Sequence, residues 1–396
     1  MLESLERVPP DPILGVSAAF AQDPSPNKID LGVGVYKDTA GKTPVPKAVR
    51  AAEAAMLAAQ ASKSYLSPVG NPAFNARVAE LVLGDDLSGR KTTLSLAQAP
   101  GGSGALRLGA ALLTAARSDV RVHVSDPTWA NHIPLLGSAG IELARYPYYD
   151  ATRHRVDFDR LIDYLRALPA GDIVLLHACC HNPTGQDLDS DQWQVIAEVL
   201  AQRALVPFLD IAYQGLGENL HADSASIRLL AKAVPELLVA VSCSKNFGLY
   251  RERTGLLMVA SEQTERADIV SGQLGRLART LWSMPPDHGA AIVAHLLGDP
   301  DLKADWIGEL THMAKRINDL RSALAQSLSA ATRTDFSWIA AQRGMFSKLP
   351  LSKEQVVAAR EQHHIYMAPD GRINIAGAST DNMERLTQGL AAVLKA

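Results

Sequence analysis

The chain has 396 residues, of which 47% are hydrophobic and 20% are charged, a composition typical of a folded globular protein and not of a disordered one. Lysine and arginine number 39 against 42 acidic residues, and the net charge of -3 offers no basic excess for nucleic acid or an anionic membrane surface. Three cysteines do not predict a disulfide framework, so we expect a cytoplasmic protein.

The first part of the chain contains one predicted helix. The N-terminal residues include no apolar run, and no later segment reaches about 18 uninterrupted apolar residues, so we expect neither a signal peptide nor a membrane span. Between Lys47 and Lys63 an alanine-rich stretch carries Val49, Ala52, Met56 and Ala59 at helical spacing. This spacing predicts a helix that turns these side chains toward the core.

Two glycine-containing segments are candidates for phosphate binding. The segment Pro100-Gly-Gly-Ser-Gly-Ala105 precedes an apolar stretch over 106–116 that predicts a buried helix, and a helix start with glycines and a hydroxyl favours phosphate. No Gly-Lys-Ser/Thr follows, so this is no Walker A loop, and a turn with a helix cap is the alternative. The segment Gly32-Val-Gly34 lacks the third glycine of a dinucleotide fingerprint, since Lys37 stands there, and we interpret it as a loop.

From about residue 100 the pattern predicts a parallel sheet. Short, nearly continuous apolar runs alternate with helical stretches, which is typical of parallel strands buried on both faces. Ligands of open α/β sheets bind beyond the carboxyl ends of the strands, so we expect the polar residues at these ends to share one cleft. The runs are Val120–Val124, Ile173–Leu176, Val206–Leu209, Leu237–Val241 and Leu256–Ala260, and the polar ends include Ser125, Asp126, His177, Asp210 and Ser242.

The segment His177-Ala-Cys-Cys-His181 contains two histidines and two thiols. In a strand that leaves the sheet these side chains alternate and cannot converge as tetrahedral zinc ligands do, so we expect no metal site. Asn182-Pro-Thr-Gly185 follows and predicts a tight turn that holds the Asn182 amide at the end of the strand. We interpret all three cysteines, Cys179, Cys180 and Cys243, as small packing residues.

Two further strand ends carry the strongest chemical candidates. Asp210-Ile-Ala-Tyr213 offers a carboxylate and a phenol to a protonated heteroaromatic nitrogen and a phenolate oxygen of one flat cofactor, with a helix N-cap as the alternative for the aspartate. Lys245 stands in a turn just past an apolar strand, where desolvation lowers the pKa of the amine and makes it nucleophilic toward an aldehyde. Arg253, with the Ser242 and Ser244 hydroxyls, can bind phosphate through charge-assisted hydrogen bonds.

After about residue 310 the pattern changes again. Long helical periodicity returns, followed by a mixed segment over Gly344–Leu349 and a short apolar strand around Ile373–Ile375. This predicts a second, smaller domain that also takes in the start of the chain. We expect an N-terminal arm over residues 1–12, a small domain over 13–46 and 313–396, and a large domain over 47–312.

Together these motifs resemble the class I, fold-type I pyridoxal-phosphate aminotransferases, in the branch that holds aspartate and aromatic-amino-acid aminotransferases. The resemblance implies an α/β fold: a large domain with a mostly parallel seven-stranded sheet flanked by helices, plus a smaller α+β domain. It also implies pyridoxal 5'-phosphate as the cofactor, amino-acid and 2-oxo-acid substrates, and a homodimer with shared active sites. The likeness runs nearly end to end, through Leu31–Asp38, Asp126–Trp129, Cys180–Gly185, Ser242–Arg253, Arg343–Phe346 and Gly371–Gly377.

The resemblance gives the cofactor residues their expected roles. Lys245 corresponds to the Schiff-base lysine, which also moves the proton at the substrate α-carbon, and Asp210 to the carboxylate that keeps the ring nitrogen protonated. Tyr213 and Asn182 correspond to the partners of the phenolic oxygen, and Trp129 to the indole stacked on the ring. The expected phosphate site comprises Gly102, Ser103, Ser242, Arg253 and Tyr65 of the partner subunit.

The resemblance also implies a substrate site. Arg372 corresponds to the arginine that grips the α-carboxylate in a bidentate fork, and Arg279 to the one that reaches across the dimer to a distal carboxylate. Gly34 joins Trp129 and Asn182 as a further substrate-binding residue. His132 and His177 correspond to residues that orient the site by contacting the side chains that bind the cofactor.

Departures from the family pattern bear on the choice of substrate. Met284 and Ser103 match the aromatic-accepting enzymes, whereas Val35, Lys37 and Thr43 match the aspartate type, and Trp282 replaces a more usual tyrosine. We therefore expect ping-pong transamination, through a Lys245 aldimine, between an aromatic amino acid (Tyr or Phe) or aspartate and 2-oxoglutarate. The alternatives are a narrow aspartate aminotransferase and, less favoured, a non-catalytic or regulatory protein on the same fold.

Overall fold

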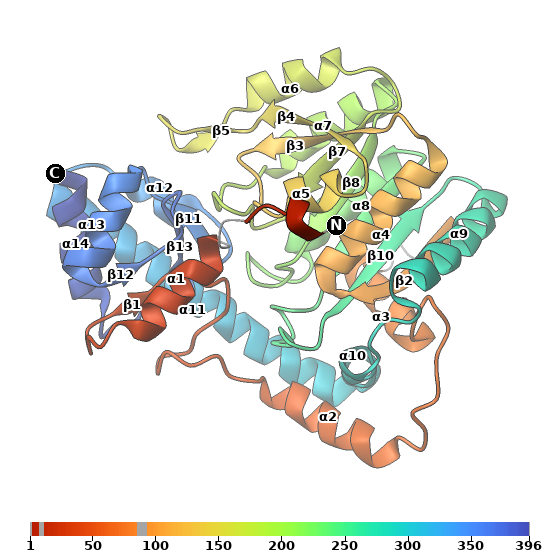
Figure 1. Ribbon diagram of the computed structural model, residues 1–396, viewed down its shortest axis with the longest axis horizontal. Helices are drawn as coiled ribbons and strands as arrows, with labels where there is room; N and C mark the ends of the chain where they lie inside the picture. Colours follow the sequence, from red (N-terminus) through yellow and green to blue (C-terminus); the bar gives the residue numbers. More distant parts are fainter. Residues whose placement is uncertain (1, 8–11, 85–92, 396) are drawn as a thin grey trace. The chain divides into compact units, whose positions relative to one another are not determined.

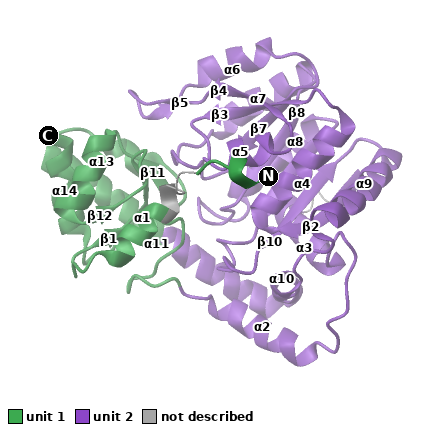
Figure 2. Cartoon of the chain, viewed as in Figure 1, with its two compact units in different colours: residues 1–43, 316–396 green, residues 44–315 purple. Residues whose placement is uncertain are grey.

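The computed structural model describes residues 2–7, 12–84 and 93–395. The chain forms two compact units, unit 1 with residues 1–43 and 316–396 and unit 2 with residues 44–315 (Figure 2). The sequence boundaries of 46/47 and 312/313 lie within three residues of these divisions. The predicted N-terminal arm includes residues 8–11, which lie outside the described residues.

Unit 2 is built on a seven-stranded sheet with the strand order β2-β10-β9-β8-β7-β3-β4 (Figure 1). The pairs from β9 to β4 are parallel, and β10 is antiparallel to both of its neighbours. The mostly parallel sheet predicted from the sequence is therefore confirmed. The strands of the sheet are β2 (Leu94–Pro100), β3 (Arg121–Asp126), β4 (Glu142–Pro147), β7 (Ile173–His177), β8 (Val206–Ile211), β9 (Leu237–Ser242) and β10 (Thr254–Ala260), and a small hairpin adds β5 (Tyr149–Asp150) and β6 (Arg155–Val156).

The direction of β10 corrects one prediction, because the apolar pattern places Leu256–Ala260 among the parallel strands and β10 is antiparallel. A parallel return from β9 needs a crossover of a dozen or more residues, usually a helix. Only the turn-rich segment 243–253 joins β9 to β10, so the chain reverses and the two strands pair with Gly255 opposite Ser242. The reversal brings both ends of this segment to the same edge of the sheet.

Both faces of the sheet are buried. Along β9, Leu238 and Ala240 join a core cluster with α4 and α9, while the alternate residues Val239 and Val241 are buried on the other face. Since side chains alternate along a strand, the continuous burial requires cover on both sides. The helices of unit 2 are α2 (Lys47–Ala59), α3 (Pro72–Leu83), α4 (Gly101–Ala116), α5 (His132–Gly137), α6 (Phe158–Ala167), α7 (Ser190–Gln202), η4 (Ala222–Ser224), α8 (Ala225–Ala233), α9 (Thr264–Trp282) and α10 (His288–Gly298).

The alanine-rich helix forms as predicted, with one exception on its inner face. Val49, Ala52 and Met56 are buried on α2, whereas Ala59 is exposed because it is the last helical residue. The predicted buried helix also forms: α4 carries Leu106 and Leu108 in the core and packs on β9, β10 and α9.

Unit 1 contains two small sheets and several helices. The strands β1 (Ile29–Asp30) and β12 (Ile365–Tyr366) pair in parallel, and β11 (Phe346–Lys348) pairs antiparallel with β13 (Arg372–Asn374). This agrees with the smaller α+β domain expected from the sequence. Its helical segments are η1 (Leu2–Ser4), α1 (Pro12–Gln22), α12 (Ser337–Ala341), α13 (Lys353–His363), η5 (Ile375–Gly377), α14 (Met383–Lys395) and the later part of α11 (Pro300–Thr332).

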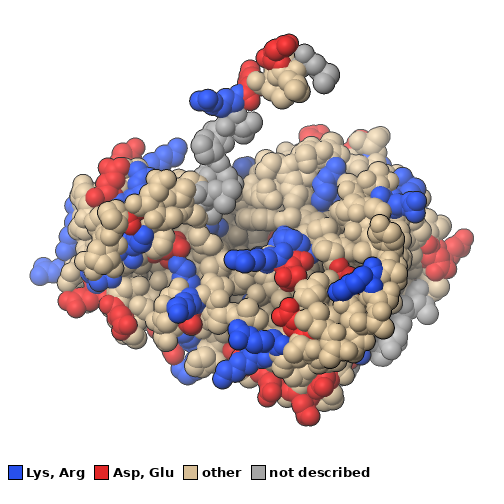
Figure 3. All heavy atoms as spheres, turned by 60° about the horizontal axis from the view of Figure 1, so that its bottom comes forward, with Lys and Arg blue, Asp and Glu red and all other residues tan. Residues whose placement is uncertain are grey.

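The described helices include none with the length and apolar character of a membrane span. Basic and acidic side chains are intermixed over the face drawn in Figure 3.

Candidate active site

The carboxyl ends of the parallel strands bring several predicted residues together in unit 2. His177 at the end of β7 is the register partner of Asp210 on β8, and Ser242 ends the neighbouring β9. Asp126 at the end of β3 departs from this group, because it is exposed and pairs with Arg145 at 2.9 Å on the surface. The predicted residues at the ends of β7, β8 and β9 therefore lie on neighbouring strands, whereas Asp126 on β3 lies apart from them on the surface.

Asp210 is a buried carboxylate with a histidine behind it. His132 Nε2 and Asp210 Oδ2 lie 3.2 Å apart, and both side chains are buried. Burial acts to raise the pKa of Asp210, but the hydrogen bond and charge of His132, with His177 and Lys245 nearby, hold that pKa below its ordinary value. The carboxylate is therefore ionised at neutral pH and presents a negative charge to whatever lies before it.

A chain of polar side chains continues behind His132. Thr128 Oγ1 lies 2.8 Å from His132 Nδ1 and 3.3 Å from His177 Nε2, and the rings of these two histidines are 5.2 Å apart. Burial, with the charge of His132, lowers the pKa of His177 to about 3, so His177 is neutral. His181 follows, its ring 4.2 Å from that of His177 and 4.2 Å from the stacked Tyr148 ring.

His181 is held by both ring nitrogens. Thr184 Oγ1 lies 2.9 Å from His181 Nδ1, and Ser125 Oγ lies 3.0 Å from Nε2. The two nitrogens are thus engaged with hydroxyls and do not converge with His177 on a metal. Among the described residues the one group with metal-ligand spacing is Cys179, Cys180 and Asp223, where the Asp223 oxygens already accept the backbone N–H groups of Gly215, Gly217 and Glu218.

The turn after β7 holds Asn182 as the sequence predicted. Asp187 accepts hydrogen bonds from the backbone N–H groups of Cys180 and His181 at 2.7 and 2.8 Å, and Gly185 donates to the His181 carbonyl at 2.7 Å. Asn182 itself is buried. The Asp187 carboxylate therefore fixes the backbone of the two residues before Asn182.

Lys245 lies beside Tyr213 in unit 2. Its Nζ is 4.9 Å from the centre of the Tyr213 ring, and Tyr213 is buried two residues after the end of β8. Burial and the charge of Arg253 lower the pKa of Lys245 to about 8, against the opposing effect of Asp210. At physiological pH a substantial fraction of this amine is neutral, which is the nucleophilic form.

The start of α4 and the segment after β9 form a cradle for an anion. Arg253 Nη1 donates to Ser244 Oγ at 3.4 Å and to the Tyr250 carbonyl at 3.1 Å. A methyl group at Gly101 would lie 2.9 Å from the Arg253 Cζ, and one at Gly102 would lie 3.0 Å from the Ser242 Cβ. The two glycines thus leave the helix start open next to an arginine and a hydroxyl, and Ser103 lies in the same first turn.

Trp129 lies next to the His132–Asp210 pair, whereas Tyr65 and Arg279 are exposed on the surface of the chain. Trp129 is partly buried and meets the His132 ring edge-on at 5.2 Å. Tyr65 lies in the coil between α2 and α3 and is 91% exposed, and Arg279 is exposed in the last turn of α9. Within one chain, therefore, neither of these two residues is packed into the lysine site.

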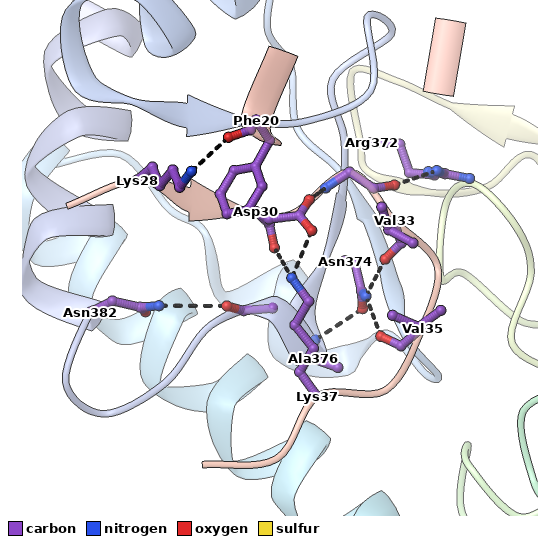
Figure 4. A network of polar contacts seen from close by, with 12 residues as sticks. Phe20, Lys28, Asp30, Val33, Val35, Lys37, Arg372, Asn374, Ala376 and Asn382 are labelled. Carbon is purple, nitrogen blue, oxygen red and sulfur yellow. Dashed lines mark hydrogen bonds and ion pairs between the residues drawn. The ribbon is translucent and has the colours of Figure 1, made fainter. Parts of the chain in front are cut away.

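Arg372 lies in unit 1, on β13, where a ring and a carbonyl hold it. Its Nη2 donates to the Gly32 carbonyl at 3.0 Å, and its Cζ lies 4.4 Å from the centre of the Phe346 ring (Figure 4 shows the carbonyl contact). Gly34 lies on the same ring, since a methyl group there would come 2.9 Å from Phe346 Cζ. The arginine, the ring and the glycine thus form one group.

The segment that carries Gly34 is tied to β13 by side chains. Asn374 Nδ2 donates to the carbonyls of Val33 and Val35 at 2.6 and 2.7 Å, and Lys37 pairs with Asp30 at 2.7 Å (Figure 4). The two Asn374 bonds span more than 330 residues of sequence and, with the local Lys37–Asp30 pair, hold the loop predicted at Gly32–Gly34 in a defined place.

The fold is that of an aminotransferase. Residues 26–390 match the family model of class I and II aminotransferases, and the chain belongs to that family of enzymes, which use pyridoxal phosphate. It is 47% identical to the tyrosine aminotransferase of Rhizobium meliloti, over 96% of this chain and 97% of that protein. It is 43% identical to the aspartate aminotransferase of Escherichia coli over the whole of both chains.

A solved structure gives the same result in three dimensions. The aromatic-amino-acid aminotransferase of Burkholderia pseudomallei, covalently bound to pyridoxal phosphate, superposes with a TM-score of 0.96 at 46% identity, over 100% of this chain and 99% of that one. The fold type and the family inferred from the sequence motifs are therefore confirmed.

Two groups of residues escaped the sequence analysis. The sequence indicates Ser125 only as a polar strand end and gives Thr128 and Thr184 no role, although each lies within hydrogen-bond distance of a buried histidine. Arg321 was not singled out at all, and it is buried in unit 1. A single arginine in a long helical pattern gives no sign of burial, since such residues are ordinarily solvated.

Proposed function

We propose that the enzyme transfers the amino group between an aromatic amino acid or aspartate and 2-oxoglutarate, with pyridoxal 5'-phosphate bound at Lys245. The observation that carries the proposal is the setting of Lys245: a partly buried amine of lowered pKa next to Tyr213, on the same sheet edge as the ionised Asp210. The names of the aromatic and aspartate relatives support this substrate range.

The residues present fit the phosphate of this cofactor. The helix α4 starts at Gly101 without a side-chain cap, and its start lies against Arg253 and Ser242. Free backbone N–H groups at a helix start and a guanidinium both favour a phosphate dianion. We assign the phosphate to Gly102, Ser103, Ser242 and Arg253, and the ring to Trp129, Asn182, Asp210 and Tyr213.

When bound, the cofactor supplies an aldehyde that condenses with amines and a protonated ring that withdraws electrons from the substrate α-carbon. Lys245 would hold the cofactor through its amine. When free of the cofactor, the same amine would take the proton from the substrate α-carbon and return it on the other side of the transferring nitrogen.

Asp210 has an electrostatic part in this scheme. Its carboxylate would keep the ring nitrogen of the bound cofactor protonated, because the contact with His132 holds Asp210 in the ionised form. Thr128 fixes the His132 ring by its other nitrogen, so that Nε2 points to Asp210. The catalytic residues in this proposal are Lys245, Asp210 and Tyr213.

Substrate binding is assigned to two arginines. Arg372 receives the α-carboxylate that every amino acid and 2-oxo acid carries, in the two-pronged geometry that a guanidinium offers a carboxylate. Arg279 receives the distal carboxylate of aspartate, glutamate or 2-oxoglutarate, and aromatic substrates bind without it. Gly34, Trp129 and Asn182 complete the substrate-binding set.

The proposal includes a homodimer with shared active sites in the cytoplasm. Tyr65 and Arg279 are exposed in the single chain, which suits residues that complete the site of a partner subunit. The three cysteines are free and buried, which suits a reducing compartment. Neither nucleic acid nor a membrane is part of the proposal.

Steady-state rates test the substrate range. The purified enzyme is assayed with Asp, Phe and Tyr as donors, each at several concentrations of 2-oxoglutarate. We expect turnover of all three donors and parallel lines in double-reciprocal plots, because the first 2-oxo acid leaves before the second binds. Turnover of Asp alone would establish the narrow aspartate aminotransferase instead, and intersecting lines would refute the two-step exchange.

A further inference from the structure

Arg321 is a buried cation in unit 1. It lies on α11 and is 1% exposed. Burying a guanidinium is costly unless its N–H groups find acceptors, so its partners indicate what it holds. Its terminal nitrogens donate to five oxygens, which are the carbonyls of Ile339, Gly344 and Phe346, Ser347 Oγ and Gln342 Oε1, at distances from 2.5 to 3.3 Å.

All five acceptors belong to one short segment, residues 339–347. The segment leaves α12 at Ala341, turns at Gly344 with a φ of 75°, and enters β11 at Phe346. Arg321 Nη2 bonds the carbonyls on either side of Met345, at 2.5 Å to Gly344 and 3.0 Å to Phe346. The guanidinium therefore fixes the backbone at the residue whose ring lies next to Arg372.

Phe346 passes this placement on to the carboxylate-binding group. Its ring lies 4.4 Å from Arg372 Cζ and against Gly34. The strand pairing aligns Phe346 with Asn374 and Lys348 with Arg372, so a shift of β11 would also displace the backbone of Arg372. Two routes, one through the ring and one through the strand, thus connect Arg321 to Arg372.

We propose that Arg321 is a positioning residue for substrate binding: it fixes Phe346 beside Arg372 and so sets the orientation in which Arg372 receives the α-carboxylate. This inference rests on the proposed function, in which Arg372 binds that carboxylate. The positioning depends on the fork shape of the guanidinium, because one planar group reaches carbonyls two residues apart and a side-chain oxygen at once.

Two substitutions, Arg321→Lys and Arg321→Met, test whether the positioning depends on the fork shape of the guanidinium. Lysine keeps the charge but not the fork, and methionine keeps the approximate length and packing alone. We expect KM for both the amino donor and 2-oxoglutarate to rise about tenfold in Arg321→Met, equivalent to about 1.4 kcal/mol, and less in Arg321→Lys. The value of kcat is expected to change less than about threefold, because the chemistry at Lys245 lies elsewhere.

The matched control is Arg316→Met on the same helix. Arg316 also donates to backbone carbonyls, but these belong to Asp38 and Ala378 and lie outside segment 339–347. A second reference, Arg372→Lys, tests the carboxylate role itself. Binding of 3-indolepropionic acid, a carboxylate without an amino group, is measured by calorimetry for each variant, together with the absorbance of the bound cofactor and the unfolding temperature.

The possible outcomes distinguish the positioning role of Arg321 from the carboxylate-binding role proposed for Arg372. Weaker binding of the acid in both the Arg321 and Arg372 variants, with unchanged cofactor absorbance and a normal Arg316→Met, supports the inference. If Arg372→Lys weakens binding and folded Arg321→Met and Arg321→Lys do not, the positioning role is wrong and the proposed function stands. If Arg372→Lys leaves binding unchanged, the carboxylate role fails and the inference fails with it. Should Arg321→Met not fold, Arg321→Lys and Ser347→Ala decide the matter by the same readouts, with smaller expected increases in KM.

Discussion

The substitution Gly101→Ala tests the phosphate cradle. Gly101 has a φ of 72°, and the added methyl group would lie 2.9 Å from the Arg253 Cζ. Two separate effects follow from this geometry. The left-handed backbone costs an alanine about 1 to 2 kcal/mol of folding stability, with or without the cofactor. In addition, the displaced guanidinium loses its charge-assisted hydrogen bonds to the phosphate, worth about 1.5 to 3 kcal/mol.

Only the second effect changes the affinity for the cofactor. We expect the dissociation constant of pyridoxal phosphate to rise about 10- to 150-fold, since about 1.4 kcal/mol corresponds to a factor of ten. The constant is measured by titrating the cofactor-free protein, and the stability by thermal unfolding of that same form. The control is Gly272→Ala on α9, where a methyl group meets nothing within 4 Å and is expected to stabilise the protein slightly.

A double-mutant cycle tests whether Gly101→Ala lowers the affinity for the cofactor through Arg253. If Gly101→Ala acts by displacing Arg253, then it should cost no further affinity in an Arg253→Ala background. Two outcomes would refute the reasoning. Unchanged affinity in Gly101→Ala would mean that Arg253 does not contact the phosphate, and additive losses would mean that the methyl group acts on the helix start directly.

Three further predictions concern the chemistry. Lys245→Ala should abolish the change in cofactor absorbance on adding an amino acid, and a persisting change would refute the role of the lysine. In the cofactor-free protein, burial and Arg253 lower the pKa of Lys245 to about 8, so its reactivity toward an amine reagent should rise with pH to half its limit near pH 8; a midpoint near 10.5 would contradict this. Arg279→Ala should lower kcat/KM for Asp about 10- to 150-fold through the lost charge-assisted bonds, while Tyr changes little. The neighbouring exposed Arg276→Ala is the control, and equal losses on both substrates would exclude the role proposed for Arg279.

The motifs around the sheet were predictable because strand ends and turns are local. The apolar run before Asp210 and the turn after His177 define both residues' positions without reference to the rest of the chain, and the structure places them as register partners. The periodicity of α2 likewise predicted Val49, Ala52 and Met56 as buried. The roles given to these site residues stay predictions until the variants are measured.

What escaped prediction depends on distant parts of the chain. The burial of Arg321 requires the segment 339–347 to fold over it, and nothing in the neighbouring helical sequence specifies that cover. The direction of β10 is another such case, since an apolar run does not specify whether its strand pairs parallel or antiparallel with its neighbours. The β2 strand, Leu94–Pro100, was missed because small and polar residues interrupt its apolar pattern.

The reversed strand β10 has a consequence for how this enzyme can be altered. The segment 243–253 carries Lys245 and returns to the sheet beside its starting point, with Gly255 opposite Ser242. The positions of Lys245 and Arg253 therefore depend on the path of this segment between two fixed strand ends, and an insertion within it would move the lysine, Arg253 or both. Loops at the opposite ends of the parallel strands have no such requirement, so we expect natural and designed insertions to collect there and to be excluded from this segment.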